Sequence, residues 1–168
     1  SAYKILLYRQ HSAALKLERL NARIRYLPSM DNEEYPLAIH LTIDQRWNGT
    51  RQDMELVPRL LGLSTIELHH AQVDDDLIAQ LESIYTLTGI RLKKCSITDT
   101  CIRHLSQFDS LNEVEILYCP VGPGCFASLA EFRRLSSLRL IGTDVAPSNA
   151  DLLEQRLAAT VDIRRGAF

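Results

Sequence analysis

Between residues 63 and 164 the hydrophobic residues recur with a fixed period. Each copy reads Leu-x-x-(Ile/Val/Leu)-x-(Leu/Ile), and the step between copies is 24 residues. The copies begin at Leu63, Leu87, Leu111 and Leu135. Counting the first Leu as offset 0, offsets 0, 3 and 5 are the predicted inward positions of a short strand. A repeat of this length indicates stacked units, each of which buries its apolar edge only against its neighbours.

The rest of each copy predicts a helical segment that returns to the start of the next strand. Offset 10 is aliphatic in every copy, and offset 18 is always Leu. These residues are Val73, Ile97, Val121 and Val145 at offset 10, and Leu81, Leu105, Leu129 and Leu153 at offset 18. Asp75, Asp99 and the stretch 146–148 stand where helices should begin, since acidic residues, Ser and Pro suit a helix N-terminus. Pro123 and Gly124 predict a shorter or distorted return segment in the third copy.

Residues 1–62 are less regular. The hydrophobic pattern predicts a helix from His11 to Asn21 and strands at 23–27 and 37–43, separated by a polar loop. A helical segment at 51–61 should break at Pro58. The first ten residues are interpreted either as a packed helix or as a remnant that lay next to a membrane.

Ile39 and Leu41 precede Ile66 and Leu68 by 27 residues, which predicts a longer, irregular first repeat. Because the end units of a stacked array have to cover its open core, residues 1–62 are expected to form an N-terminal cap. Residues 63–168 then hold the repeats and a C-terminal edge strand around Val161 and Ile163. We expect one continuous domain.

The copy at 87–99 reads Leu-x-x-Ile-x-Leu-x-x-Cys-x-Ile-Thr-Asp, which resembles the leucine-rich repeat family in its bacterial variant with Cys/Thr-x-Ile/Val-Thr-Asp repeats. The resemblance implies an α/β fold, a right-handed solenoid whose parallel sheet forms the concave face, with about four regular repeats and an N-terminal cap. It implies a binding role and carries over no catalytic residue. Residues 14–26 also resemble the segment that precedes such repeats, often behind a membrane anchor.

Charge and hydropathy limit the classes of partner. The net charge of -2 argues against nucleic acid, whose binding proteins carry a strong basic excess. No run approaches the roughly 18 apolar residues of a bilayer span, so the chain as given is expected to be soluble. The location is left open between the cytoplasm and a membrane reached through a missing N-terminal segment.

The four cysteines share two positions of the repeat. Cys95 and Cys119 are 24 residues apart, and so are Cys101 and Cys125. Mostly small or apolar residues replace them in the other copies, so we interpret them as reduced, buried packing residues. Stacked neighbours can also approach disulfide distance, which leaves a bridge as the alternative.

Offset 4 is a column of alternating charge on the outward side of the strands. It holds Glu67, Arg91, Glu115, Arg139 and Asp162, with His40 as its predicted extension. Opposite charges on neighbouring strands stabilise each other and help to fix register. We interpret the column as a structural ladder; a surface that reads a ligand is the alternative.

Offsets 6 and 7 combine basic and apolar residues. The candidate partner-binding residues are His69, Lys93, Leu117, Tyr118, Ile141 and Arg164. Exposed aliphatic and aromatic side chains beside cations are typical of an interface centre. Coverage of Leu117 and Ile141 by flanking loops is the other interpretation.

Enzymatic motifs are missing from the sequence: it has no Gly-rich phosphate loop, nucleophile elbow or His-Glu-x-x-His pattern. Adjacent His69 and His70 should point to opposite sides of a strand, and the acidic run 74–76 is better explained as a helix start. We therefore expect no enzyme, no cofactor and no metal. The predicted function is binding of an unidentified protein through the concave sheet. The alternative is an assembly ectodomain tethered by a missing N-terminal segment.

Overall fold

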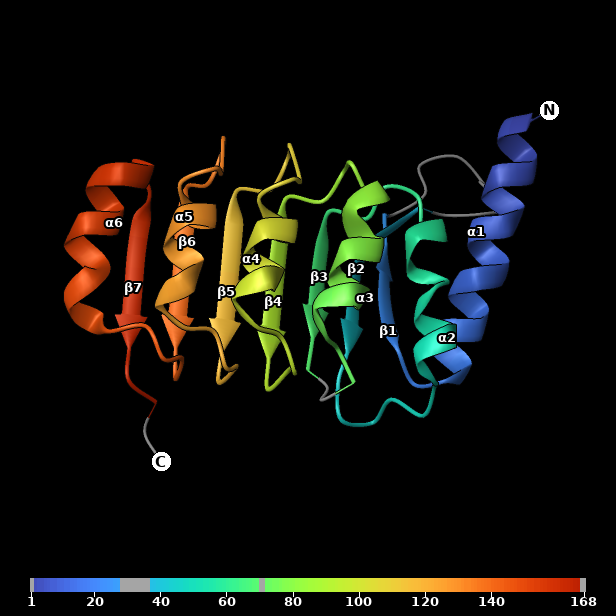
Figure 1. Ribbon diagram of the computed structural model, residues 1–168. Coiled ribbons are helices and arrows are strands. Elements are labelled where there is room, and N and C mark those ends of the chain that lie inside the picture. The colour runs from blue at the N-terminus through green and yellow to red at the C-terminus, as the bar shows by residue number, and fades with distance from the viewer. Residues whose placement is uncertain (1, 28–36, 70–71, 167–168) are drawn as a thin grey trace.

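The computed structural model describes residues 2–27, 37–69 and 72–166, and its centre is a seven-stranded sheet (Figure 1). The strands follow chain order across the sheet, β1 to β7. Their bounds are β1 Arg23–Tyr26, β2 Ala38–Ile43, β3 Thr65–Leu68, β4 Gly89–Lys93, β5 Glu113–Leu117, β6 Ser137–Ile141 and β7 Thr160–Arg164. Every neighbouring pair is parallel except β1 and β2.

Six α-helices accompany the described strands, and those that connect parallel strands lie on one face of the sheet (Figure 1). Their bounds are α1 Ala2–Arg19, α2 Arg51–Met54, α3 Asp75–Gln80, α4 Asp99–Leu105, α5 Phe126–Leu129 and α6 Ala150–Leu157. None of the described helices lies on the opposite face, which we call the open face (Figure 1). Parallel strands in one sheet need such crossover segments, which explains the alternation of strand and helix along the chain.

From β3 to β6, residues that pair between neighbouring strands are separated by the same 24 residues as the sequence repeats. Ile66 pairs with Ile90, Ile90 with Val114, and Val114 with Leu138. The last step is one residue shorter, since Leu138 pairs with Val161. The C-terminal edge strand predicted around Val161 and Ile163 is thus present as β7, one residue closer along the chain than the repeat period.

The first repeat corrects the predicted alignment. Leu41 pairs with Ile66 and Thr42 with Glu67, a step of 25 residues where the sequence suggested 27. A slip of two residues keeps every inward side chain inward, because side chains alternate between the two faces of a strand. The hydrophobic pattern alone therefore could not distinguish the two alignments.

The N-terminal region contains one long helix that joins the predicted segment from His11 to the first ten residues, for which a helix was one of the two interpretations. α1 buries Leu7, Ala14 and Leu17 against the end of the sheet. The predicted helix at 51–61 is broken earlier than expected: α2 ends at Met54, and a 3₁₀ turn at Val57–Arg59 contains Pro58. The predicted loop at 28–36 lies outside the described residues.

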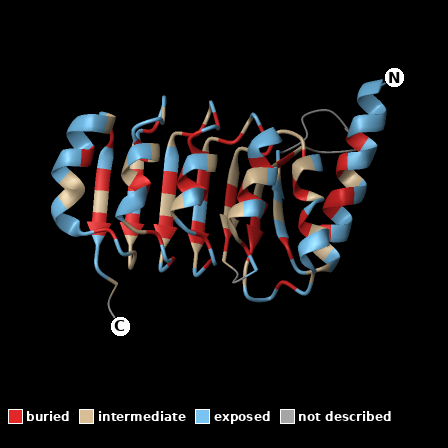
Figure 2. Ribbon diagram, viewed as in Figure 1, coloured by how far each residue is buried: buried red, intermediate tan, exposed pale blue. Residues whose placement is uncertain are grey.

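One hydrophobic cluster fills the space between sheet and helices, and it extends from Ala13 in α1 to Ile163 in β7 (Figure 2). All residues predicted at offsets 0, 3, 5, 10 and 18 of the four copies are buried. The stacking of equivalent residues explains why the period is so constant: an insertion in one copy would move its side chains out of the shared core.

Side chains of Asp bridge consecutive repeats on the helical side. α3 and α4 begin at Asp75 and Asp99, as predicted, but the side chains that cap them belong to Asp74 and Thr98. Asp75 instead accepts hydrogen bonds from the backbone N–H (2.8 Å) and hydroxyl (2.5 Å) of Thr98 in the next repeat. Asp99 accepts from the N–H of Gly122 at 2.5 Å. Each carboxylate thus ties its repeat to the following one.

The third return segment is short, as Pro123 and Gly124 predicted. It consists of a 3₁₀ turn, Pro123–Cys125, and the four residues of α5. Pro123 stands at the repeat position that Asp75 and Asp99 occupy in the two earlier copies. The third return segment therefore has no bridging carboxylate at this position. Another 3₁₀ turn, Pro147–Asn149, begins the fourth return segment before α6.

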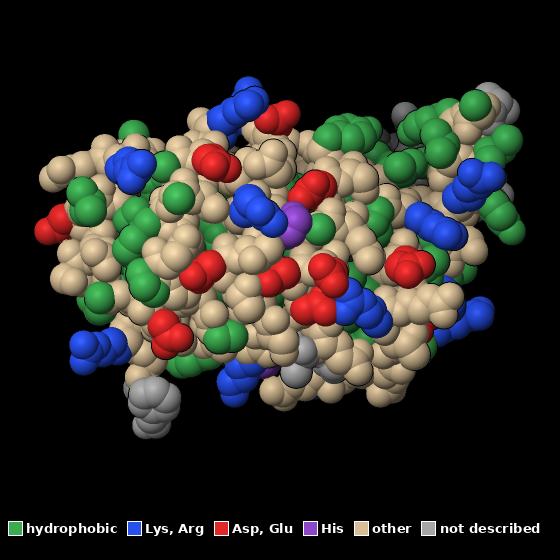
Figure 3. Space-filling view, viewed as in Figure 1, with side chains coloured by type: hydrophobic (Ala, Val, Ile, Leu, Met, Phe, Trp, Pro, Cys, Tyr) green, Lys and Arg blue, Asp and Glu red, His purple; other side chains and the backbone are tan. Residues whose placement is uncertain are grey.

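Hydrophobic side chains gather on the surface at the N-terminal end of α1 (Figure 3). The exposed ones in the first two turns are Tyr3, Ile5, Leu6 and Tyr8. No described helix is both long enough and apolar enough to cross a bilayer.

Candidate functional surface on the open face

Outward side chains of the parallel strands form three rows across the open face. The row at the amino ends of the strands holds His40, Thr65, Gly89, Glu113, Ser137 and Thr160. The middle row holds Thr42, Glu67, Arg91, Glu115, Arg139 and Asp162. The carboxyl-end row holds Lys93, Leu117, Ile141 and Arg164, with His69 directly after β3. Strands lie about 4.8 Å apart, so neighbours within a row are in reach of each other.

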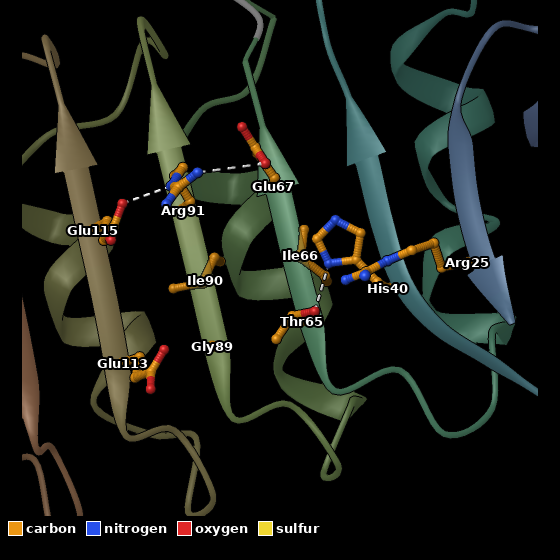
Figure 4. Close-up of a pocket in the computed structure, with 10 residues that line it drawn as sticks. All are labelled: Arg25, His40, Thr65, Ile66, Glu67, Gly89, Ile90, Arg91, Glu113 and Glu115. Carbon is orange, nitrogen blue, oxygen red and sulfur yellow. Dashed lines mark hydrogen bonds and ion pairs between the residues drawn. The ribbon is translucent and has the colours of Figure 1, made fainter. Parts of the chain in front are cut away.

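Neighbouring charges of the middle row are paired with one another. Glu115 lies between two guanidinium groups, 2.6 Å from Nε of Arg91 and 3.0 Å from Nη1 of Arg139. Glu67 lies 3.7 Å from Arg91, and Asp162 lies 3.5 Å from Arg139 (Figure 4 shows the first part of the row). The hydrogen bond to Glu115 raises the pKa of Arg91. Every charged residue proposed for the ladder therefore has an opposite charge beside it.

His40 lies outside this row, contrary to the predicted extension. Thr42 stands beside Glu67, and His40 belongs to the amino-end row next to Thr65. Its Nδ1 lies 2.6 Å from the Thr65 hydroxyl and its Nε2 lies 3.0 Å from the Thr42 hydroxyl. Burial, with a further contribution from the charge of Arg25, lowers the pKa of His40.

The carboxyl-end row is basic at its first strands and apolar at its later ones. Leu117 and Ile141 are directly paired neighbours and are half-buried. Lys93 precedes them in the row, and it forms no ion pair with any residue that the structure describes. Arg164 follows them, but its Nε binds Asp162 at 2.7 Å. The row therefore offers an apolar pair with one unpaired cation at its side.

Among the candidate partner-binding residues, His69 has weaker support from the structure. Its Nε2 lies 3.5 Å from Nε2 of Gln45, at the limit of a hydrogen bond. Burial and the charges of Lys93 and Lys94 lower the pKa of His69. His70 lies outside the described residues. In the described part of the chain, no group of three His, Cys, Asp or Glu side chains has the arrangement of a metal site.

Tyr118 is held flat across the backbone of the next two repeats. A Cβ atom on Gly142 would lie 2.5 Å from ring atom Cδ1, and one on Gly166 would lie 2.8 Å from Cε1. Gly142 also has a φ of +63°, a conformation that favours glycine. The ring remains 42% exposed and borders a hollow of about 340 Å³ that Pro147 and Arg165 also line. The lack of side chains at Gly142 and Gly166 thus lets the exposed ring of Tyr118, beside Leu117, lie against the backbone; we call this arrangement the seat of Tyr118.

A second hollow, which sequence reasoning missed, lies over Gly89 (Figure 4). It has a volume of about 230 Å³ and is lined mainly by residues of the amino-end and middle rows, with Arg25 of β1 and the inward residues Ile66 and Ile90. A glycine inside a strand marks a place where another group can come close to the backbone, and this was the available signal. It was overlooked because offset 2 is variable and shows no pattern of its own.

The four cysteines do not contribute to the open face. All are buried, as predicted, and none forms a disulfide in this structure. The N–H of Cys95 donates to Sγ of Cys119 at 3.3 Å, which shows how directly equivalent positions stack. Burial raises the pKa of Cys125 to about 12 and raises that of Cys101 as well. Neutral thiols at these two positions are packing groups, not nucleophiles.

No protein-family model matches the chain, and no curated protein matches it in sequence. A solved structure described as "Leiomodin-1 Actin-Binding Site 2 (ABS2)" is similar in fold, with a TM-score of 0.54. The match covers 94% of this chain and 87% of that one, at 14% sequence identity. At this identity the likeness concerns the α/β fold alone.

Proposed function

We propose that the chain is a right-handed solenoid of the leucine-rich repeat type that binds a protein partner through the concave, open face of its sheet. The observation that carries the proposal is the apolar pair Leu117–Ile141, flanked by the exposed ring of Tyr118 and the unpaired cation of Lys93. The proposed role is non-enzymatic and needs no cofactor. The repeat template, with its constant 24-residue register, supports the assignment to this class of fold.

The contrast between the middle and carboxyl-end rows locates the proposed contact. Exposed ion pairs that already satisfy each other contribute little to binding, because a partner has to compete with charges in place. An apolar pair gains free energy when a partner removes it from water, at about 25 cal/mol per Å² of apolar surface. Aromatic residues beside such a pair are frequent energetic centres of interfaces. The apolar pair and Tyr118 are thus the proposed centre, and the ladder is its rim.

The chemistry of the surface indicates the chemistry of the partner. We expect an apolar side chain over Leu117 and Ile141, and an acidic side chain within reach of Lys93. This combination is a short segment that carries an aliphatic or aromatic residue near an Asp or Glu.

The experiment that tests the proposal is affinity capture from a lysate of the source organism with two variants. The variant Leu117→Asp with Ile141→Asp should remain folded and lose the partners that the unmodified chain captures. The matched control is Tyr85→Asp with Leu152→Asp, which adds the same charges at two exposed hydrophobic residues outside the three rows, one before β4 and one in α6. Capture that is equal for both variants would move the interface away from this row.

A further inference from the structure

The hollow over Gly89, which we call the socket, is open to solvent and has a volume of about 230 Å³. Gly89 belongs to the open-face row between Thr65 and Glu113. A Cβ atom at Gly89 would lie 3.2 Å from Cγ2 of Thr65 and 3.9 Å from Oε2 of Glu113. The Thr65 methyl group and the Glu113 side chain thus lie close on either side of Gly89, and the Glu113 carboxylate borders the hollow (Figure 4).

Glu113 is the one lining carboxylate that has no ion pair within the described residues. Of the other two, Glu115 binds Arg91 and Arg139, while Glu67 lies 3.7 Å from Arg91. Two arginines and three glutamates line the hollow, so their formal charges sum to -1. His40 adds no positive charge at neutral pH, since burial lowers its pKa.

The remaining cation of the lining lies at the opposite end of the hollow. Arg25 comes from β1 and extends toward His40, whereas Glu113 comes from β5 (Figure 4). Three strand spacings of about 4.8 Å separate β1 from β4, but Glu113 is on the strand adjacent to Gly89. A charged group over Gly89 is thus closer to the free carboxylate than to Arg25.

We propose that the socket over Gly89 binds a basic side chain of the protein partner, with Glu113 as its counter-ion. An arginine fits best, because its planar guanidinium can donate two parallel hydrogen bonds to one carboxylate. This inference rests on the proposed function and adds a second determinant to it. Gly89 and Lys93 are the ends of β4, four residues or about 13 Å apart. An extended partner segment therefore reaches from the apolar pair to the socket with about four residues.

The test uses small probes, and so does not require the partner to be known. N-acetyl-arginine amide is titrated into the ¹⁵N-labelled full chain, and amide shifts are followed by NMR. We expect saturable shifts at Gly89, Ile90 and Glu113 with a millimolar dissociation constant. N-acetyl-norleucine amide and N-acetyl-glutamate amide should leave these signals in place.

Substitutions separate the socket from general attraction of a cation. Glu113→Gln should weaken binding of the arginine probe by about tenfold, the loss expected for one charge-assisted pair worth about 1.4 kcal/mol. Glu55→Gln removes an equal charge from an exposed position on α2's C-terminal cap and should have no effect. Absence of shifts at Gly89, equal shifts with the glutamate probe, or unchanged affinity in Glu113→Gln would each overturn the inference.

Failure of the socket and failure of the proposed function give different results. Leu117→Asp with Ile141→Asp leaves the socket intact, so it should still bind the arginine probe while losing the captured partner. A chain that captures its partner through the apolar pair but ignores the probe would refute the socket alone. A chain that binds the probe and captures the same partners in both variants would refute the apolar contact alone.

Discussion

The two faces of the sheet use alternate residues of the same strands for different purposes. In β4, Leu92 is fully buried under the helices while its neighbour Arg91 is exposed on the open face. The buried face is nearly identical from repeat to repeat, whereas the rows of the open face differ: the middle row is charged, the carboxyl-end row holds the apolar pair, and the amino-end row contains Gly89. Uniformity reflects a shared core, and the variable face is the one that we propose binds a partner. Substitutions on the first face should affect folding, and those on the second should affect binding.

The largest expected effect lies on the buried face. Leu105→Ala removes a fully buried side chain from α4 and should lower the free energy of unfolding by about 2–5 kcal/mol. Leu152→Ala, at an exposed residue of α6, is the matched control and should change it by less than about 0.5 kcal/mol. Urea unfolding measures both. Equal effects would mean that the core is not shared as the repeat template requires.

A smaller loss should follow from Asp99→Ala, which removes the acceptor of the Gly122 N–H in the next repeat. Hydrogen bonds to charged groups contribute about 1.5–3 kcal/mol, so unfolding should be easier by that order. Asp109→Ala breaks a largely exposed pair with Arg133 and should change the free energy of unfolding very little. The bridging role of Asp99 is contradicted if the two variants unfold at the same urea concentration.

The seat of Tyr118 predicts an intermediate effect at a glycine. Gly142→Ala puts a Cβ into left-handed backbone, at a cost of about 1–2 kcal/mol, and displaces the tyrosine ring. Gly166→Ala also meets the ring but requires no left-handed conformation, so it should cost less. Thermal unfolding of the two variants compares them directly; a larger loss in Gly166→Ala would be inconsistent with backbone strain at Gly142.

The charge ladder should give the smallest change in stability. Glu115→Gln leaves Arg91 and Arg139 next to each other with one fewer counter-charge, and should cost no more than about 1 kcal/mol at low salt. The difference should shrink in 1 M salt, where the Debye length is about 3 Å. A loss that survives high salt would show that Glu115 acts through packing and not through charge.

Much of the fold could be predicted from the period of the hydrophobic residues. The inward residues, the register of β3 to β6 and the early closure at Val161 follow from spacing alone, because equivalent side chains must stack in one core. The place of β2 could not be predicted, since a two-residue slip preserves the faces. The hydrogen bonds of Asp75 and Asp99 to the next repeat depend on loop geometry, which the spacing of the hydrophobic residues does not determine.

The open face was less accessible to sequence reasoning. The middle row could be predicted, because its charges alternate at the repeat period. The seat of Tyr118 could not, since it depends on two glycines in later repeats, Gly142 and Gly166, and the sequence does not show which ring meets them. The socket lies over Gly89, a residue of the amino-end row that has no side chain. A single glycine can be interpreted in this way only when its neighbours across the sheet are known.

Site-specific photo-crosslinking in the source cells tests most directly whether the open face meets the partner. A benzophenone amino acid replaces Tyr118, beside the apolar pair, or Tyr85, which is 83% exposed and lies before β4. Irradiation should give a crosslinked protein adduct from position 118 and none from position 85. An adduct from position 85 alone would contradict the proposed interface.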